Sequence, residues 1–204
     1  MGMRKFVPGL QYSLFSLFIA AGASLPGTVT ADSANKGSPS HHHHPKPSPQ
    51  YHDRTGEFVK IVRDVTRRYR DPAVAIADGY VEQFGCVSGS HEGAMGVHLV
   101  NFPLVVDGVL DPTKPELLVY EPQPNGDLKL VAADYLIFSA DWHKNNPAPP
   151  ELLGQLFHLF EAPNRFGLDM FYTLHVWAWR ENPQGTFANW NPNVSCDHFN
   201  DDAS

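Results

Sequence analysis

The chain has 204 residues, of which 22 are acidic and 15 are Lys or Arg, and its formal net charge is -7. This length predicts one domain with additional segments, and a domain of this size buries a real hydrophobic core. The negative charge argues against nucleic acid and anionic membranes as partners, because both require clustered basic side chains.

Residues 1–31 are predicted to form a signal peptide. Arg4 and Lys5 precede an apolar run from Leu10 to Leu25, and Val29 to Ala31 supplies small residues for cleavage. The apolar run is shorter than the ~20 residues that a membrane-spanning helix needs. We therefore predict a secreted or periplasmic protein that has no membrane association after cleavage of the signal.

Residues 32–53 are rich in Ser, Pro, Lys, Asn and His and lack apolar periodicity, which predicts a disordered linker. His41 to His44 form a run of four imidazoles, which bind transition metals when neutral. A flexible tract offers no fixed geometry and loses conformational entropy on ordering, so a solvated tract is the preferred interpretation. The remaining residues, 54–204, are predicted to form a single domain.

Two helices are predicted at the start of this domain. The apolar residues of the first recur at steps of three and four: Phe58, Ile61, Val62, Val65 and Tyr69. Asp71 and Pro72 are a strong start signal for the second helix, which has an apolar stripe running to Phe84. After Cys86 the pattern becomes typical of strands.

Two strand-like runs, Leu117 to Pro122 and Asp127 to Phe138, flank Asn125-Gly126, a dipeptide that predicts a tight hairpin. Within the second run, Asp134 is predicted to share a face with Leu130. Helices followed by antiparallel strands indicate an α+β fold. Its sheet is either open and covered by the helices or curled into a small barrel, which removes exposed edges.

The segment after the hairpin is predicted to contain a short helix and an aromatic strand. Residues 151–160 have the spacing of a helix that packs Leu152, Leu156 and Phe160. The aromatic strand ends at Arg180 and its alternation places one set of side chains on a common, inward face: Phe171, Thr173, His175, Trp177 and Trp179.

The sequence contains two cysteines, Cys86 and Cys196. In an exported chain two cysteines are expected to pair, and a disulfide that closes so long a loop stabilises by about 4–5 kcal/mol in the chain-entropy model. Neither cysteine has the short spacing of a metal-binding pair. We therefore predict a disulfide that ties the first strand to the end of the β-region.

Two histidines in strand-like segments, His98 and His175, are the best candidates for a functional site. Three carboxylates in or beside apolar segments are candidate partners: Glu92, Glu121 and Asp134. A buried charge is costly unless it is paired or binds a metal. Two histidines and one carboxylate suit Zn, Fe, Mn or Cu.

Glu92 and His98 are separated by roughly 20 Å if the chain between them is extended at ~3.3 Å per residue. They meet only if the chain bends at Gly93 and Gly96, which glycine permits. Further candidates for the pocket are Tyr172, Trp177 and His158.

Four segments together resemble a widespread group of small exported, mostly bacterial proteins of uncharacterised function: Glu92 to His98, Asp107 to Pro122, Leu174 to Pro183 and Trp190 to Cys196. The resemblance covers roughly residues 69–196 and implies no catalytic assignment. At Asp134 the resemblance leads us to expect Glu, so a carboxylate is retained with a shorter reach.

The sequence thus favours an exported protein whose pocket binds a divalent metal or a small molecule, with a metal-dependent enzyme as one version of this function. The alternative is a non-catalytic binding module in which the histidines are structural core residues. His91, Glu92 and His98 lack the spacing of a His-Glu-x-x-His metalloprotease, and the chain has no nucleophile elbow or phosphate-binding loop.

Overall fold

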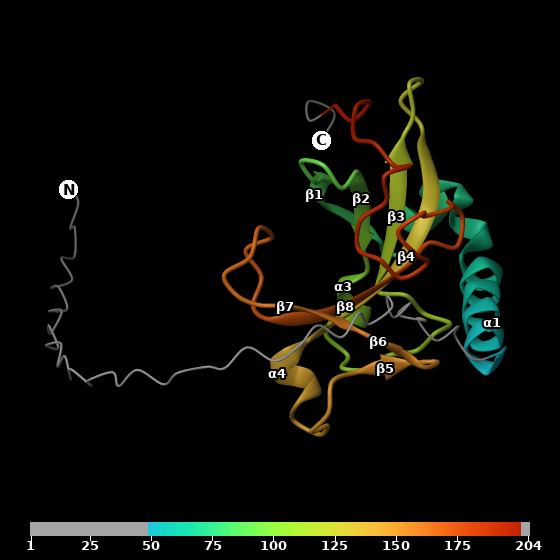
Figure 1. The fold of residues 1–204 in the computed structure, drawn as a ribbon. Helices are drawn as coiled ribbons and strands as arrows, with labels where there is room; N and C mark the ends of the chain where they lie inside the picture. Colours follow the sequence, from blue (N-terminus) through green and yellow to red (C-terminus); the bar gives the residue numbers. More distant parts are fainter. Residues whose placement is uncertain (1–48, 201–204) are drawn as a thin grey trace, which may run out of the picture. The chain divides into compact units, whose positions relative to one another are not determined.

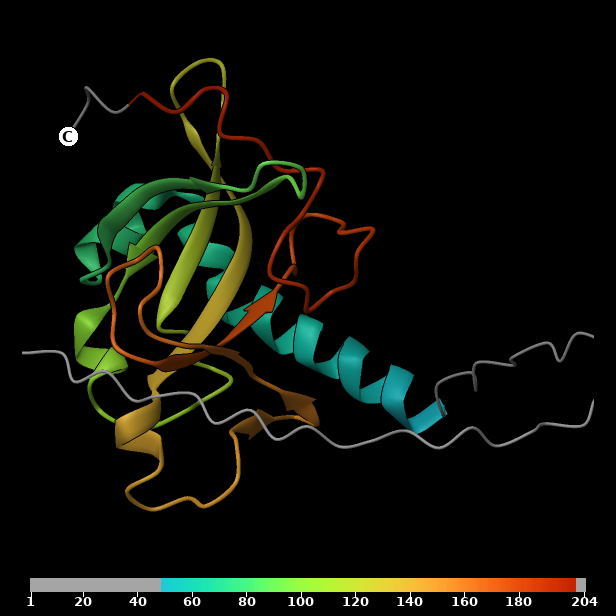
Figure 2. The same ribbon diagram turned by 60° about the vertical axis from the view of Figure 1, so that its left-hand side comes forward.

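The computed structural model describes residues 49–200, with side chains from residue 54 onward. The predicted signal peptide and most of the predicted linker lie outside this range. Figure 1 shows an α+β architecture in which a six-stranded antiparallel sheet has the strand order β1-β2-β3-β4-β8-β7. The long strands curve strongly in Figure 2, so the sheet forms a half-barrel.

The helices are α1 (Pro49–Thr66), the 3-10 helix η1 (Arg67–Arg70), α2 (Pro72–Ala77), α3 (Phe102–Val105) and α4 (Ser139–Trp142). The Asp71 side chain accepts a hydrogen bond from the Ala73 amide at the start of α2, as its sequence signal indicates. The predicted helical stripe to Phe84 is wrong, because Gly79 adopts a positive φ and Val81 begins the first strand.

The sheet contains β1 (Val81–Ser88), β2 (Ala94–Val100), β3 (Leu117–Pro122), β4 (Leu128–Phe138), β7 (His158–Phe160) and β8 (Phe171–Val176). The predicted hairpin is confirmed, since β3 and β4 pair antiparallel across the Asn125-Gly126 turn. A separate two-stranded sheet contains β5 (Glu151–Leu152) and β6 (Gln155–Leu156).

The short helix predicted for residues 151–160 is wrong. Leu153 and Gly154 both have positive φ and form a two-residue turn that pairs Leu152 with Gln155. Leu156, a member of the predicted helical stripe, is 65% exposed. The local turn therefore overrides the helical spacing of the apolar residues.

Both faces of the central strands β2, β3, β4 and β8 are buried. On the face toward α1, Tyr135, Leu174 and Val176 pack in a cluster with Phe58 and Val62. The residues that alternate with them along β4 and β8 point to the opposite, concave face. Each long strand therefore contributes one set of side chains to the helix side and another to the interior of the half-barrel.

The aromatic strand ends earlier than predicted. β8 stops at Val176, and the indole Nε1 of Trp179 donates a hydrogen bond to the Thr66 hydroxyl of α1 at 3.0 Å. Trp179 therefore does not share a face with His175, because the alternation of a strand is lost where the strand ends.

A β-bulge in β4 changes the faces of the residues before it. Val119 pairs with Ala132, whereas Tyr120 pairs with Leu130, so Val131 is an extra residue. Leu130 consequently packs in the cluster that contains Tyr120, on the helix side. The predicted common face of Leu130 and Asp134 is therefore wrong.

A second irregularity lies at Gly96 in β2, which has φ of 110°. A Cβ atom at this position would lie 2.5 Å from the Tyr120 carbonyl oxygen. Only glycine therefore allows β3 to approach β2 this closely. This close approach brings Met95 and His98 into the wall of the same cavity.

We expect Gly96→Ala to lower the free energy of unfolding more than Gly108→Ala. Gly108 has φ of 73° but open space around it, so alanine costs only the backbone strain, about 1–2 kcal/mol. At Gly96 the clash with β3 adds about 1–3 kcal/mol. Urea unfolding of both variants measures the difference, and equal losses would show that β3 moves away without cost.

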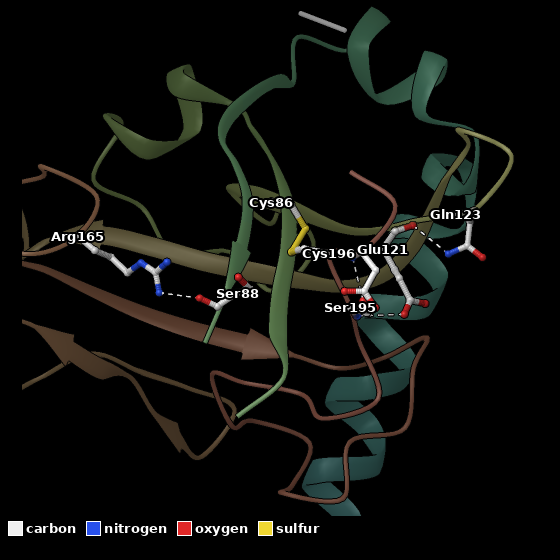
Figure 3. The surroundings of a disulfide bond; sticks show 8 residues. Cys86, Ser88, Glu121, Gln123, Arg165, Ser195 and Cys196 are labelled. Carbon is white, nitrogen blue, oxygen red and sulfur yellow. Dashed lines mark hydrogen bonds between the residues drawn. A yellow bond between two sulfur atoms is a disulfide. The ribbon is translucent and has the colours of Figure 1, made fainter. Parts of the chain in front are cut away.

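The predicted disulfide is confirmed: Cys86 of β1 is bonded to Cys196, with 5.7 Å between the Cα atoms (Figure 3). Next to it, the Ser195 amide donates a hydrogen bond to Glu121 Oε1 at 3.3 Å. The C-terminal segment is thus fixed to the sheet by a covalent bond and a polar contact.

None of the helices that the structure describes has both the length and the hydropathy to span a bilayer.

Candidate metal centre

Three polar side chains from three strands converge inside the half-barrel: His98 of β2, Asp134 of β4 and His175 of β8. One potential ligand atom from each lies within 4.8 Å of the other two. Asp134 and His175 are directly opposite each other in the antiparallel pairing of β4 and β8. Within residues 54–200 this is the group of His, Asp, Glu or Cys side chains whose spacing suits a metal ion.

The curvature of the sheet brings His98 to the other two residues. β2 and β8 are separated by β3 and β4, so in a flat sheet their backbones would lie roughly 14 Å apart at ~4.8 Å per strand. The ring centroids of His98 and His175 are only 5.8 Å apart, with the rings perpendicular. Side chains that point into the concave face therefore meet across two intervening strands.

All three side chains are buried, with exposed fractions of 4% for His98, 3% for Asp134 and 2% for His175. Asp134 Oδ1 accepts a hydrogen bond from the Thr173 hydroxyl at 2.6 Å and lies 3.5 Å from His175 Nδ1. In contrast, Nδ1 of His98 and both ring nitrogens of His175 make no hydrogen bond of good geometry, although the Asn189 side chain is near enough to His175 to oppose the lowering of its pKa. Buried polar atoms are normally satisfied, so these nitrogens indicate a missing ligand.

Burial sets the protonation state of the cluster. Removal from water lowers the pKa of His98 and of His175, and for His98 the positive charge of His175 acts in the same direction. Burial raises the pKa of Asp134, although the Thr173 hydrogen bond opposes this rise. Both imidazoles are therefore neutral at pH 7, which is the form that binds metal ions.

Packing fixes the orientation of His175. The Trp177 ring stacks on it with a centroid distance of 6.0 Å and an interplanar angle of 19°. The Trp177 indole in turn donates a hydrogen bond to the Ala188 carbonyl oxygen at 2.6 Å. A large aromatic ring with a fixed position thus holds one face of the imidazole.

A narrow cavity of about 20 Å³ adjoins the three polar residues. This volume has room for about one water molecule. Apart from the cluster and Thr173, its walls are apolar and include Met95, Leu117, Leu136, Phe160, Phe166 and Phe171. The cluster therefore faces a small space with mainly apolar walls.

The structure does not bring the other predicted carboxylates to this centre. Glu92 is exposed in the β1–β2 loop, where its carboxylate accepts a hydrogen bond from the His91 amide. Glu121 points toward Ser195 and lies 3.9 Å from Arg180 (Figure 3). The two glycines serve close backbone contacts: Gly93 lies against the backbone of Asn191 and Gly96 against that of Tyr120. They do not turn the Glu92 side chain into the cavity.

The predicted pocket residues have different positions. Trp177 contacts His175, as described. Tyr172 points to the other face of β8 and its hydroxyl pairs with His143 Nε2 at 2.9 Å. His158 is exposed, with Nε2 3.2 Å from the Phe187 carbonyl oxygen. Tyr172 and His158 therefore do not line the cavity beside His98.

Sequence reasoning missed a buried carboxylate, Glu116, which is 1% exposed. Its Oε2 accepts a hydrogen bond from the Leu136 amide at 3.2 Å, at the end of the β3–β4 pairing. Burial raises the pKa of Glu116 to about 8, and the charge of Asp134 contributes to this rise. The sequence offered one sign of this residue: Glu116 directly precedes the apolar run that begins at Leu117. A carboxylate beside a buried strand needs a partner.

We expect Glu116→Gln to flatten the pH dependence of stability. Between about pH 4.5 and 8 the folded chain keeps a proton on Glu116 that the unfolded chain has released, so stability falls as pH rises. The slope from this group is up to about 1.4 kcal/mol per pH unit. Urea unfolding of metal-free protein across this range measures it, and identical slopes in the wild type and the variant would contradict the expectation.

Comparisons of the chain with protein-family models, with curated proteins and with solved structures returned no match. The geometry of the centre is therefore the basis for assigning a function.

Proposed function

We propose that His98, Asp134 and His175 bind one divalent transition-metal ion. The observation that carries this proposal is that buried ring nitrogens of His98 and His175 lack a hydrogen-bond partner, while one potential ligand atom of each histidine lies within 4.8 Å of a ligand atom of Asp134. A buried polar group without a partner costs about 1–3 kcal/mol. A metal ion bound between the two rings removes this cost for one ring nitrogen of each histidine.

A purely structural role for the histidines accounts less well for these contacts. Even the exposed His143 has partners at both ring nitrogens, the Asn146 carbonyl oxygen and the Tyr172 hydroxyl, and a buried histidine normally has a hydrogen bond on at least one. His175 has neither, although Asp134 Oδ1 is only 3.5 Å from its Nδ1. This distance exceeds hydrogen-bonding range but fits two ligands of the same ion.

Two imidazoles and one carboxylate form a donor set that suits Zn, Fe, Mn or Cu. The three residues supply fewer ligands than these metals take, so at least one coordination position faces the cavity. An ion with such an open position polarises a bound molecule or activates water. We infer a metal-dependent enzyme, in which Thr173 holds the carboxylate in place through its hydrogen bond.

The disulfide supports the proposal that this metal protein is exported, because disulfides persist in oxidising compartments. The alternative of an apolar-ligand carrier is less well supported, since a cavity of about 20 Å³ is far below the roughly 300 Å³ of typical small-molecule pockets.

Metal ions should stabilise the folded protein through this centre. At a free metal concentration of 100 times Kd we expect the free energy of unfolding to rise by about 2.7 kcal/mol, because the metal binds only the folded state. Thermal unfolding with and without Zn²⁺ or Fe²⁺ measures this gain in a full-length chain whose His41 to His44 are replaced by alanine.

Asp134→Asn is the matched control, because the amide keeps the size of the side chain and an oxygen that accepts the Thr173 hydrogen bond. The gain in stability should disappear in this variant. An equal gain in Asp134→Asn and in the parent chain would place the bound metal elsewhere and refute the proposed centre.

A further inference from the structure

We propose that the ligand which completes this centre is a small uncharged molecule of about the size of dioxygen, and that polar or polymeric substrates are excluded. This inference rests on the proposed function and adds the class of molecule that the metal receives. Three features of the cavity carry it: its size, the chemistry of its walls and its connection to the surface.

The size of the cavity limits the ligand first. About 20 Å³ holds one water molecule or a molecule of two heavy atoms, whereas a sugar, a peptide or a phosphate ester needs several times more space. The three residues of the centre are 2–4% exposed, so a large substrate does not reach them from outside. Hydrolysis of a polymer is therefore incompatible with this arrangement.

The walls of the cavity limit the polarity of the ligand. Among the described residues that line the cavity, Thr173 is the one polar side chain besides the centre itself, and its hydroxyl is already committed to Asp134 Oδ1. No Lys or Arg lines the cavity within the part of the chain that the structure describes. Any polar group that is not bound to the metal would thus stay unpaired, at a cost of about 1–3 kcal/mol.

Aromatic side chains form the outer part of the cavity. Phe84 is 41% exposed and its ring packs edge-on against Phe166 at a centroid distance of 5.4 Å. Phe84 has φ of 72°, a rare conformation for a bulky residue, in the irregular part of β1 between Gln83 and Cys86. Packing against Phe166 holds Phe84 in this conformation, and its exposed ring lies in the cavity wall, between the centre and the surface.

The segment that carries Phe166 is fixed to β1, the strand that also carries Phe84. The Arg165 guanidinium donates a hydrogen bond to the Ser88 carbonyl oxygen at 2.9 Å (Figure 3) and lies 5.7 Å from the Trp190 ring centroid. These contacts connect residues 161–170 to the end of β1 and to the C-terminal segment. The Phe84–Phe166 pair therefore forms a narrow apolar filter that admits small uncharged molecules.

Nitric oxide is a suitable probe, because it is uncharged, has two heavy atoms and binds ferrous iron. We would load the full-length protein with Fe²⁺ without oxygen and record electron paramagnetic resonance spectra with nitric oxide. Imidazole and phosphate are the larger and the charged probes. The wild type should bind nitric oxide and neither of the others.

Phe166→Ala should widen the path and admit imidazole, so imidazole binding should be at least about tenfold tighter than in the wild type, or about 1.4 kcal/mol. Phe102→Ala, an exposed aromatic residue outside the cavity, is the control and should match the wild type.

The possible failures are distinguishable. Iron uptake without nitric oxide binding, or imidazole or phosphate binding to the wild type as tightly as to Phe166→Ala, overturns the size and polarity filter and leaves the metal centre intact. Binding of Zn²⁺ without Fe²⁺ also overturns it, since a dioxygen-class ligand requires a redox-active metal. No uptake of any metal refutes the proposed function itself.

Discussion

Alanine at His175 lowers the affinity for a divalent metal by at least about 100-fold, whereas alanine at His158 leaves it unchanged. Removal of a residue that only hydrogen-bonds to a metal ligand typically lowers metal affinity 10–100-fold, so removal of a ligand itself should lower the affinity further. His158 is a matched control because it is a histidine of the neighbouring strand β7 that lies outside the cluster. Titration with Zn²⁺ against a competing chelator measures both affinities.

The stability of the metal-free protein separates a ligand from a core residue. Truncation of His175 to alanine removes buried contacts with Trp177 and destabilises the fold in either case. Asp134→Asn retains the packing and should abolish metal binding with little loss of stability. Tight metal binding by both His175→Ala and Asp134→Asn would contradict the assignment of these residues as ligands.

Loss of the disulfide should have the largest effect on stability. Replacement of Cys86 and Cys196 by serine in one variant should lower the free energy of unfolding by about 4–5 kcal/mol, because the bond closes a loop with a sequence separation of 110 residues. The bond fixes the C-terminal segment against β1, and this segment also contacts Glu121 through Ser195.

Urea unfolding of the double-serine variant and of the oxidised wild type measures this loss. Reduction of the wild type under non-denaturing conditions should have the same effect as the substitutions. A double-serine variant with an unchanged unfolding midpoint would show that tertiary packing alone holds the C-terminal segment, and that the loop-closure entropy has been overestimated.

Local signals in the sequence predicted much of the fold. Asn125-Gly126 determined the β3–β4 hairpin, and Asp71 marked the start of α2. These predictions succeeded because turn and cap chemistry depends on neighbouring residues only. The prediction of a helix for residues 151–160 was wrong because it relied on the spacing of apolar residues and did not recognise the local turn at Leu153 and Gly154.

The candidate site was predicted in part. His98, Asp134 and His175 were all candidates, but the sequence did not decide between Asp134 and Glu121, and it allowed Glu92 if the chain bends at Gly93 and Gly96. The choice among the carboxylates depends on register, which places Asp134 opposite His175, and on the curvature that brings His98 across two strands. Neither property is a function of local residues, because both arise from how the whole sheet twists and bulges.

The aromatic filter was not predictable either. Phe84 appeared to continue the stripe of a helix, and Phe166 lies in a loop without a periodic pattern. The bulge in β1 and the contacts of Arg165 bring these two rings together, and both depend on tertiary structure. The chemistry of the centre was thus visible in the sequence, whereas the control of access to it was not.

X-ray absorption spectroscopy tests the central claim most directly. We would load one equivalent of Zn²⁺ into the full-length chain with His41 to His44 replaced by alanine. The spectrum should show two imidazole ligands with Zn–N distances of about 2.0–2.1 Å and a carboxylate oxygen at about 2.0–2.2 Å. One imidazole should be lost in His98→Ala and one in His175→Ala. A spectrum with oxygen ligands only, or one that both substitutions leave unchanged, would contradict a metal centre formed by His98, Asp134 and His175.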